Sequence, residues 1–430
     1  MDATTYQDYV NILHEELVPA MGCTEPIAIA YAAAVARQTL GRPAQRMEVE
    51  ASGNIIKNVK SVFVPNTGGL RGIPAAAAAG MAAGDPALEL EVLSSIGEGE
   101  QAAIRQYLAD TPIAVKLADS PFIFDIAIRA WAGEDSALVR IVNYHTNIVR
   151  VERNGQVLKE VEAQAAAEEG LTDKSVLTVE GILEFAREAA LADVEDAVGR
   201  QVRYNTAIAQ EGLRGDYGAN IGKVLLATYG EDVKIRAKAM AAAGSDARMN
   251  GCGLPVVIVS GSGNQGLTAS LPVVEYAKEL GADWETTLRA VLVSDLITIH
   301  LKAEIGRLSA YCGAVSAGCG SGAGIAWLYG REKEPQALLK DVSHTIVNAL
   351  AVDSGIVCDG AKASCAAKIA SAVDAGLLGF YMYQNGQQFR GGDGIISKGV
   401  EQTIRNIGLL ATQGMRETDR EILDIMTTRC

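Results

Sequence analysis

Residues 256–266, VVIVSGSGNQG, join an apolar run to a glycine-rich loop, and the amphipathic run LTASLPVVEYAKEL follows. A strand, such a loop and a helix make the dinucleotide fingerprint, whose glycines permit a tight turn at a pyrophosphate. Backbone N–H groups at a helix N-terminus bind a carboxylate equally well. No second β-α-β half follows, since ETTLRAVLVSDLITIHL (285–301) is typical of a helix. We therefore favour binding of a substrate carboxylate or amino group by Ser262, Asn264 and Gln265 over binding of NAD.

The patterns around this stretch predict an α+β fold. Two helical patterns over 6–40 flank MGCTE, and strand-like texture begins at residue 46. Residues 112–162 predict a β-meander with an Asn154-Gly155 hairpin turn, and the pattern beyond residue 170 is mostly helical. We predict an N-terminal region, 1–175, with helices and a mixed or antiparallel sheet. A larger, mainly helical region, 176–430, carries most of the motifs considered below.

Composition limits the classes of partner. The chain has 430 residues, 49% of them hydrophobic and 21% charged, with a formal net charge of -14, which disfavours nucleic acid. No apolar run reaches about 18 residues without a charge or turn signal, so we expect no membrane span. The start, MDATTYQDYV, does not resemble a secretory signal, and seven cysteines are an odd number. We expect a cytoplasmic homo-oligomer, a dimer, that binds a small molecule.

The segment LVPAMGCTEPIAIAYAAA places Cys23 at a predicted helix start. Pro26 suits the first turn, and Thr24 is a preferred N-cap residue. The helix dipole should lower the pKa of Cys23 and give a thiolate near neutral pH, although Glu25 acts in the opposite direction. Local sequence leaves two interpretations open, a reactive thiol and a buried cysteine in a helix-entry turn.

Four further cysteines occur in two segments, RLSAYCGAVSAGC (307–319) and CDGAKASC (358–365). The small residues between Cys312 and Cys319 fit either tight helix packing or a site. Cys358 and Cys365 converge if the first lies in a turn and the second in the first turns of a helix. Their spacing lacks the paired CxxC of a zinc site, and the four histidines show no HExxH pairing.

Five motifs together resemble one known family. GCTEP (22–26), SDARM (245–249), SGSGNQG (260–266), RLSAYC (307–312) and CDGAKASC (358–365) look like the L-cysteine desulfidase family, which is related to the α-chain of iron–sulfur L-serine dehydratases. The resemblance covers nearly the whole chain in order. It implies a lyase that uses a [4Fe-4S] cluster with one open iron, and no pyridoxal phosphate, to convert L-cysteine to pyruvate, ammonia and hydrogen sulfide.

The resemblance also assigns roles to residues. The three cluster ligands of the family match Cys312, Cys358 and Cys365, and the cysteine proposed there as catalytic base matches Cys23. Cys319, seven residues after Cys312, is the alternative first ligand. Other polar residues were assigned to substrate binding from their local settings: Thr24, Glu25, Asn54, Lys57, Asn66, His145, Asp246 and Arg248. His145 is either such a contact or a buried structural histidine, and Asp246 and Arg248 either orient substrate or form a helix-start ion pair.

Three other functions stay open at this point. L-Serine or L-threonine dehydration is the near alternative, because an open iron would polarise a hydroxyl equally well. A nicotinamide-dependent oxidoreductase depends on the glycine loop alone, and the third alternative is a non-catalytic amino-acid-binding protein. The leading hypothesis makes a geometric prediction. The glycine loop, RLSAYC and CDGAKASC should meet at one pocket, with GCTEP in its wall.

Overall fold

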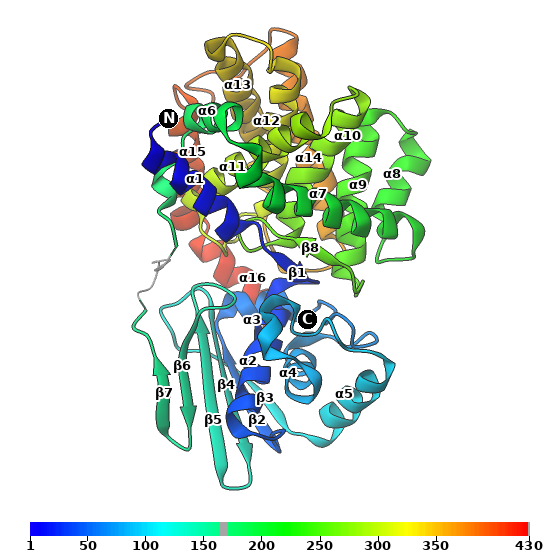
Figure 1. Cartoon of the computed structure of the whole chain (residues 1–430), viewed down its shortest axis with the longest axis vertical. Helices are drawn as coiled ribbons and strands as arrows, with labels where there is room; N and C mark the ends of the chain where they lie inside the picture. The colour runs from blue at the N-terminus through cyan, green and yellow to red at the C-terminus, as the bar shows by residue number, and fades with distance from the viewer. Residues whose placement is uncertain (164–170, 429–430) are drawn as a thin grey trace.

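The computed structural model describes residues 1–163 and 171–428, and it has two regions stacked along the long axis (Figure 1). The lower region is α+β. Its helices are α2 (Thr24–Leu40), α3 (Gly53–Val59), α4 (Gly72–Ala83), η1 (Pro86–Glu91) and α5 (Glu98–Asp110). Its strands are β2 (Arg46–Ala51), β3 (Ile113–Leu117), β4 (Asp125–Ala132), β5 (Asp135–Val142), β6 (Ile148–Arg153) and β7 (Gln156–Glu160).

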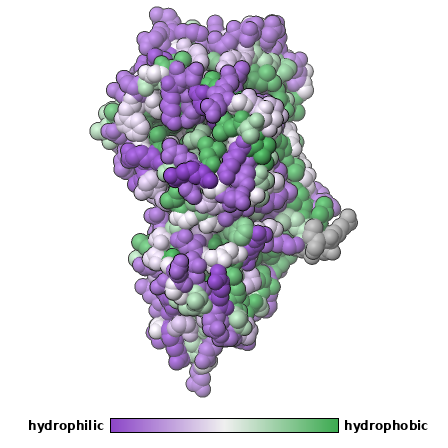
Figure 2. All heavy atoms as spheres, turned by 90° about the vertical axis from the view of Figure 1, so that its right-hand side faces the viewer, coloured by the Kyte–Doolittle hydropathy of each residue, from purple (hydrophilic) through white to green (hydrophobic). Residues whose placement is uncertain are grey.

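The upper region is helical, so the predicted α+β class is confirmed. It comprises α1 (Ala3–Glu16), η2 (Lys174–Val176), α6 (Val179–Glu188), α7 (Leu191–Arg214), α8 (Ile221–Tyr229), α9 (Val233–Met249), α10 (Gly263–Glu279), α11 (Trp284–Ile305), α12 (Gly313–Gly330), α13 (Pro335–Asp353), α14 (Cys365–Gln384) and α15 (Val400–Leu409). A π-helical turn, η3 (Leu410–Gly414), leads into α16 (Arg416–Thr428). Figure 2 shows hydrophilic side chains spread over both regions on one face of the molecule.

The sheet has the order β3-β2-β4-β5-β6-β7, and α2 packs against β4, β5 and β6. The predicted meander is correct for β4 to β7, and Asn154 and Gly155 both have the positive φ that such a hairpin turn needs. The prediction was wrong for β3, which pairs in parallel with β2 instead of joining the meander. His145 lies in the connection between β5 and β6.

The two regions are linked at both ends of the chain. Although α1 begins the sequence, it packs against α7 and η2 of the helical region. At the other end, α16 leaves the helical region and packs against α3. The boundary near residue 175 stays a prediction, because the chain crosses between the regions elsewhere as well.

The small residues of α12 allow close helix packing. A Cβ built on Gly318 would lie 2.2 Å from the carbonyl oxygen of Ala372 on α14. Since real Cβ atoms do not approach so closely, only glycine permits these backbones to touch. In the part of the chain that the structure describes, α14 is also the one helix long and apolar enough to cross a membrane, and it packs against α9, α12 and α13.

The stretch 256–266 forms a different structure from a dinucleotide fold. β8 (Pro255–Val257) has three residues and pairs antiparallel with β1 (Pro19–Met21) in a two-stranded sheet. Gly266 lies against this strand, where a Cβ would be 2.0 Å from the Val257 carbonyl oxygen. The glycine therefore serves the close packing of α10 on β8. Without a parallel neighbour for β8, the loop has no Rossmann crevice in which to hold NAD.

Candidate active site

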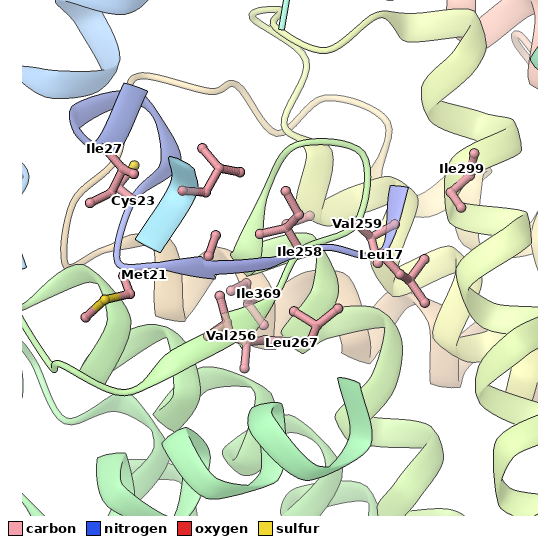
Figure 3. Close-up of a cluster of buried hydrophobic side chains, with 14 of the residues drawn as sticks. Leu17, Met21, Cys23, Ile27, Val256, Ile258, Val259, Leu267, Ile299 and Ile369 are labelled. Carbon is pink, nitrogen blue, oxygen red and sulfur yellow. The ribbon is translucent and has the colours of Figure 1, made fainter. Parts of the chain in front are cut away.

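All five motifs contribute to one cavity of about 100 Å³ between the two regions. The helical region provides the glycine loop, Cys312, Cys358 and Cys365, and the α+β region provides Cys23 and Glu25. The convergence predicted from the sequence is therefore present. Figure 3 shows Cys23, at the N-cap of α2, in a cluster of buried apolar side chains that includes Val256, Ile258 and Leu267 from β8 to α10.

A hydrogen-bonded pair, Cys23 and Glu25, forms the lower wall. The Cys23 thiol donates to Glu25 Oε2 over 3.0 Å, and Asn58 Nδ2 on α3 donates to Oε1 over 2.8 Å. The predicted N-cap was one residue off, because Cys23 occupies that position and makes no side-chain capping bond. Thr24 is the first helical residue, and its hydroxyl donates to the Gly261 carbonyl over 2.9 Å. Thr24 thus joins α2 to the glycine loop.

The expectation of a lowered pKa at Cys23 is wrong. Burial, and next the charge of Glu25, raise the pKa of the Cys23 thiol well above its usual value. The free-energy cost of removing the thiolate from water is larger here than its stabilisation by the helix dipole. Burial also lowers the pKa of His145 to about 4, so this imidazole is neutral at pH 7. Burial opposes ionisation of Glu25, yet its pKa is lowered, first by the charge that His145 carries when protonated and then by the hydrogen bonds from Cys23 and Asn58.

Three thiols form the opposite wall. The segments around Cys312 and Cys358 pair as an antiparallel bridge between Tyr311 and Val357. The Cys312 N–H donates to the Ile356 carbonyl over 3.0 Å, and the Cys358 N–H donates to the Ala310 carbonyl over 2.6 Å.

Cys365 begins α14 and directs its thiol at the Gly360 carbonyl, 3.7 Å away. Burial, followed by the nearby Cys358, raises the pKa of Cys312 to about 12. Burial likewise raises the pKa of Cys365. The three thiols therefore share one electrostatic environment.

Cys312, Cys358 and Cys365 line one cavity, and cysteine thiolates are the usual ligands of iron–sulfur clusters. Among the described residues, no three His, Cys, Asp or Glu side chains are grouped to hold a single metal ion. The cavity lining also has four cationic side chains, Arg248, Lys302, Arg307 and Lys368, against one acidic side chain, Glu25. This positive charge opposes the effect of burial on the thiols, since cations stabilise the thiolate form that binds iron.

The other cysteines lie away from this cavity. Cys319 is buried, with its thiol directed at the Ile346 carbonyl 3.6 Å away on α13. Cys252 is buried as well, after the end of α9. Of the two candidates for the first ligand, only Cys312 lines the cavity. Cys430 is outside the described residues.

The cavity lining also contains polar atoms that lack a partner. Buried side-chain atoms without a hydrogen bond include Asn58 Oδ1, His145 Nε2, Arg248 Nε, Asn264 Oδ1 and Gln265 Oε1. Buried polar groups in proteins are nearly always satisfied, so this set indicates a polar ligand or water. Gly263 makes room for the guanidinium, since a Cβ there would lie 2.3 Å from Arg248 Nε.

Four predicted site residues lie elsewhere. Asn54 and Lys57 were expected at a strand end but belong to helix α3, and the buried Lys57 forms an ion pair with Asp419 of α16. Asn66, in a turn, donates to the Leu93 carbonyl over 3.0 Å. Asp246 accepts from the Gly222 N–H over 3.1 Å, and burial raises its pKa to about 6. Among the described residues, Asp246 forms no ion pair with Arg248, and it does not line the active-site cavity.

Sequence reasoning missed three cations of the lining. Arg307 is the first residue of the RLSAYC motif, and Lys368 lies three residues after Cys365 on the same helix face. Both could therefore have been predicted from their positions next to the predicted cluster ligands. Lys302 lies in the last turn of α11 and belongs to none of the five motifs. It is 4% exposed, and burial lowers its pKa to about 8.

Comparison with known proteins agrees with this architecture. The family model for the serine dehydratase alpha chain matches residues 87–424. A UPF0597 protein of Desulfitobacterium hafniense is 58% identical over 425 residues, which are 99% of this chain and 97% of that protein. Counterparts in Lachnoclostridium phytofermentans and Treponema denticola are 51% and 45% identical, and each alignment covers at least 98% of both chains. The chain therefore belongs to the UPF0597 family, related to the serine dehydratase alpha chain and thus to lyase-type enzymes.

Proposed function

We propose that this protein catalyses the β-elimination of L-cysteine with a [4Fe-4S] cluster and without pyridoxal phosphate. The observation that carries the proposal is the position of three thiols opposite the Cys23–Glu25 pair across a small polar cavity. Cys312, Cys358 and Cys365 would hold the cluster. When bound, it supplies a Lewis acid that polarises the leaving group.

The remaining residues would bind and orient the amino acid. Arg248 is 2% exposed with an unpaired Nε, so it suits the substrate carboxylate, together with Ser262 at the start of α10. The unpaired oxygens of Asn264 and Gln265 suit the ammonium group.

The Cys23–Glu25 pair would accept the α-proton. Because the thiol donates to the carboxylate, the pair holds one proton and one negative charge, and it can take a second proton. Cys23 is the member we assign to face the α-carbon. Loss of hydrosulfide leaves aminoacrylate, which tautomerises to the imine. One water then converts the imine to pyruvate and ammonia, so that cysteine and water give pyruvate, ammonia and hydrogen sulfide.

Dehydration of L-serine or L-threonine is the second candidate, favoured by the matching family model. Both candidates are tested by anaerobic reconstitution with iron and sulfide, followed by assays on each amino acid for 2-oxo acid, ammonia and sulfide. We expect absorbance near about 400 nm and faster turnover of cysteine. Faster turnover of serine would assign the protein as a dehydratase. A colourless protein with no turnover of either would contradict both proposals and favour an amino-acid-binding role.

A further inference from the structure

A second, larger cavity adjoins the active site. It has a volume of about 840 Å³ and is lined by the ends of α1 and α11, by residues 171–178 and by α15. We call it the outer chamber. It shares Ser260, Lys302 and Arg307 with the active-site cavity, so these three residues form the boundary between the two spaces.

A buried carboxylate fixes Arg307 at this boundary. Glu16 is 1% exposed and accepts from Arg307 through both oxygens, at 2.7 and 3.4 Å. Lys174 lies 3.1 Å from the same carboxylate. Lys302 donates to the Arg307 carbonyl over 3.5 Å. One anion and three cations therefore surround the boundary, in a chain whose net charge is -14.

The outer chamber contains both signs of charge, in contrast with the cationic active-site cavity. Its acidic side chains are Glu16, Asp173, Glu304 and Glu401, and its basic ones include Lys174, Lys302, Arg307 and Arg405. A mixed lining of this kind suits a zwitterion, and a cationic boundary favours solutes that bear a carboxylate.

We propose that the outer chamber is the route by which substrate reaches the active site, and that Arg307, fixed by Glu16, selects solutes with a free carboxylate. The identity of the solute as an amino acid rests on the proposed function, whereas the route and its charge preference do not. The test therefore uses the cluster-free protein and needs no turnover.

The test compares alkylation of the cavity cysteines by iodoacetate and by iodoacetamide, reagents of similar size that differ in charge. Rates are measured for each cysteine by peptide mass spectrometry. The ratio of the two rates cancels the intrinsic reactivity of each thiol. Lys302 interacts electrostatically with Cys312 and Cys358, so these two cysteines report on the boundary, and Cys365 serves as an internal comparison.

We expect Arg307→Gln to lower the iodoacetate-to-iodoacetamide ratio at Cys312 and Cys358 by roughly threefold to tenfold, and added salt to do the same in the wild type. Arg307→Lys should restore most of the ratio. Ala303→Trp, at an exposed position in the outer chamber, should slow both reagents equally. Ser343→Trp, in a separate cavity, is the control.

Two results would overturn the inference. An unchanged ratio in Arg307→Gln, with circular dichroism showing a folded protein, would remove Arg307 as the selecting residue. Unchanged rates in Ala303→Trp would place the route elsewhere. If both variants behave as expected while the reconstituted enzyme does not turn over cysteine, the route stands and the proposed reaction fails.

Discussion

The two walls of the active-site cavity contain the same reactive side chain in different surroundings. On the lower wall, Cys23 donates to the carboxylate of Glu25, an arrangement that retains the thiol proton. On the upper wall, burial raises the pKa of Cys312 and Cys365 as well, but the charge of Lys368 acts in the opposite direction. The neighbouring charge thus separates a proton-transfer thiol from metal-binding thiols. The predictions below test that separation.

The largest effect should come from the upper wall. Replacing Cys358 or Cys365 by Ser should abolish both iron loading and turnover, because each removes a thiolate ligand. The fold should persist, since neither cysteine is among the buried residues of the core and Ser is close to Cys in size. Iron and sulfide analysis, absorbance near about 400 nm and circular dichroism measure these outcomes.

Cys319→Ser is the matched control for Cys312→Ser, because Cys319 lies in the helix whose N-cap is Cys312 but points toward α13. We expect the Cys319 variant to retain its iron and the Cys312 variant to lose it. The reverse order would show that the first ligand is Cys319. A full iron complement in Cys358→Ser or Cys365→Ser would remove that residue from the ligand set.

On the lower wall, Cys23→Ala should keep the iron–sulfur absorbance and lose most turnover. Removal of a general base typically lowers the rate by about 10²–10⁴. Exchange of the substrate α-hydrogen with deuterated solvent, followed by NMR, should slow to a similar degree. Wild-type exchange in this variant would reassign proton transfer, with His145 the next candidate. Loss of iron from the variant would instead identify Cys23 as a cluster ligand. The two walls would then not differ in function.

A pH profile tests the lower wall separately from catalysis. The pKa of His145 falls from 6.5 to about 4 on folding because the ring is buried. The unfolded chain therefore binds this proton more readily, and stability should decrease as the pH falls from about 6.5 to 4. The full effect is ~3 kcal/mol, reached below the folded pKa.

His145→Gln should flatten this part of the profile, measured as the urea unfolding midpoint of the cluster-free protein. His344→Gln is the control in the helical region, where the ring is half-buried and stacks on Tyr383. An equally steep profile in His145→Gln would mean that other groups govern acid sensitivity.

The sequence predicted those features of the structure that depend on residues close to one another along the chain. Helical patterns, the Asn154-Gly155 turn and the five motifs were found because each is a local signal. The pKa of Cys23 was misjudged because burial depends on elements far away in the chain, and Lys57 was misplaced because its partner, Asp419, lies 362 residues later. Lys302 was missed because its position between the two cavities depends on contacts among elements far apart in the chain.

The smallest effect concerns the hydrogen bond that joins the walls. Thr24 Oγ1 donates to the Gly261 carbonyl across the boundary between α2 and the glycine loop, and Thr24 is 1% exposed. Thr24→Val keeps the shape of the side chain but leaves a buried carbonyl without this donor, which costs about 1–3 kcal/mol. Thr24→Ser should recover most of the loss.

Thr345→Val is the control for this last prediction, because its hydroxyl donates within α13 to the Asp341 carbonyl over 2.7 Å. That carbonyl also accepts the helical backbone N–H, so the control should lose less stability. Only Thr24→Val should also raise the KM for the amino acid, since only its bond positions the glycine loop against Cys23. Equal losses of stability in the two variants, with KM unchanged, would mean that the walls are aligned by apolar packing alone.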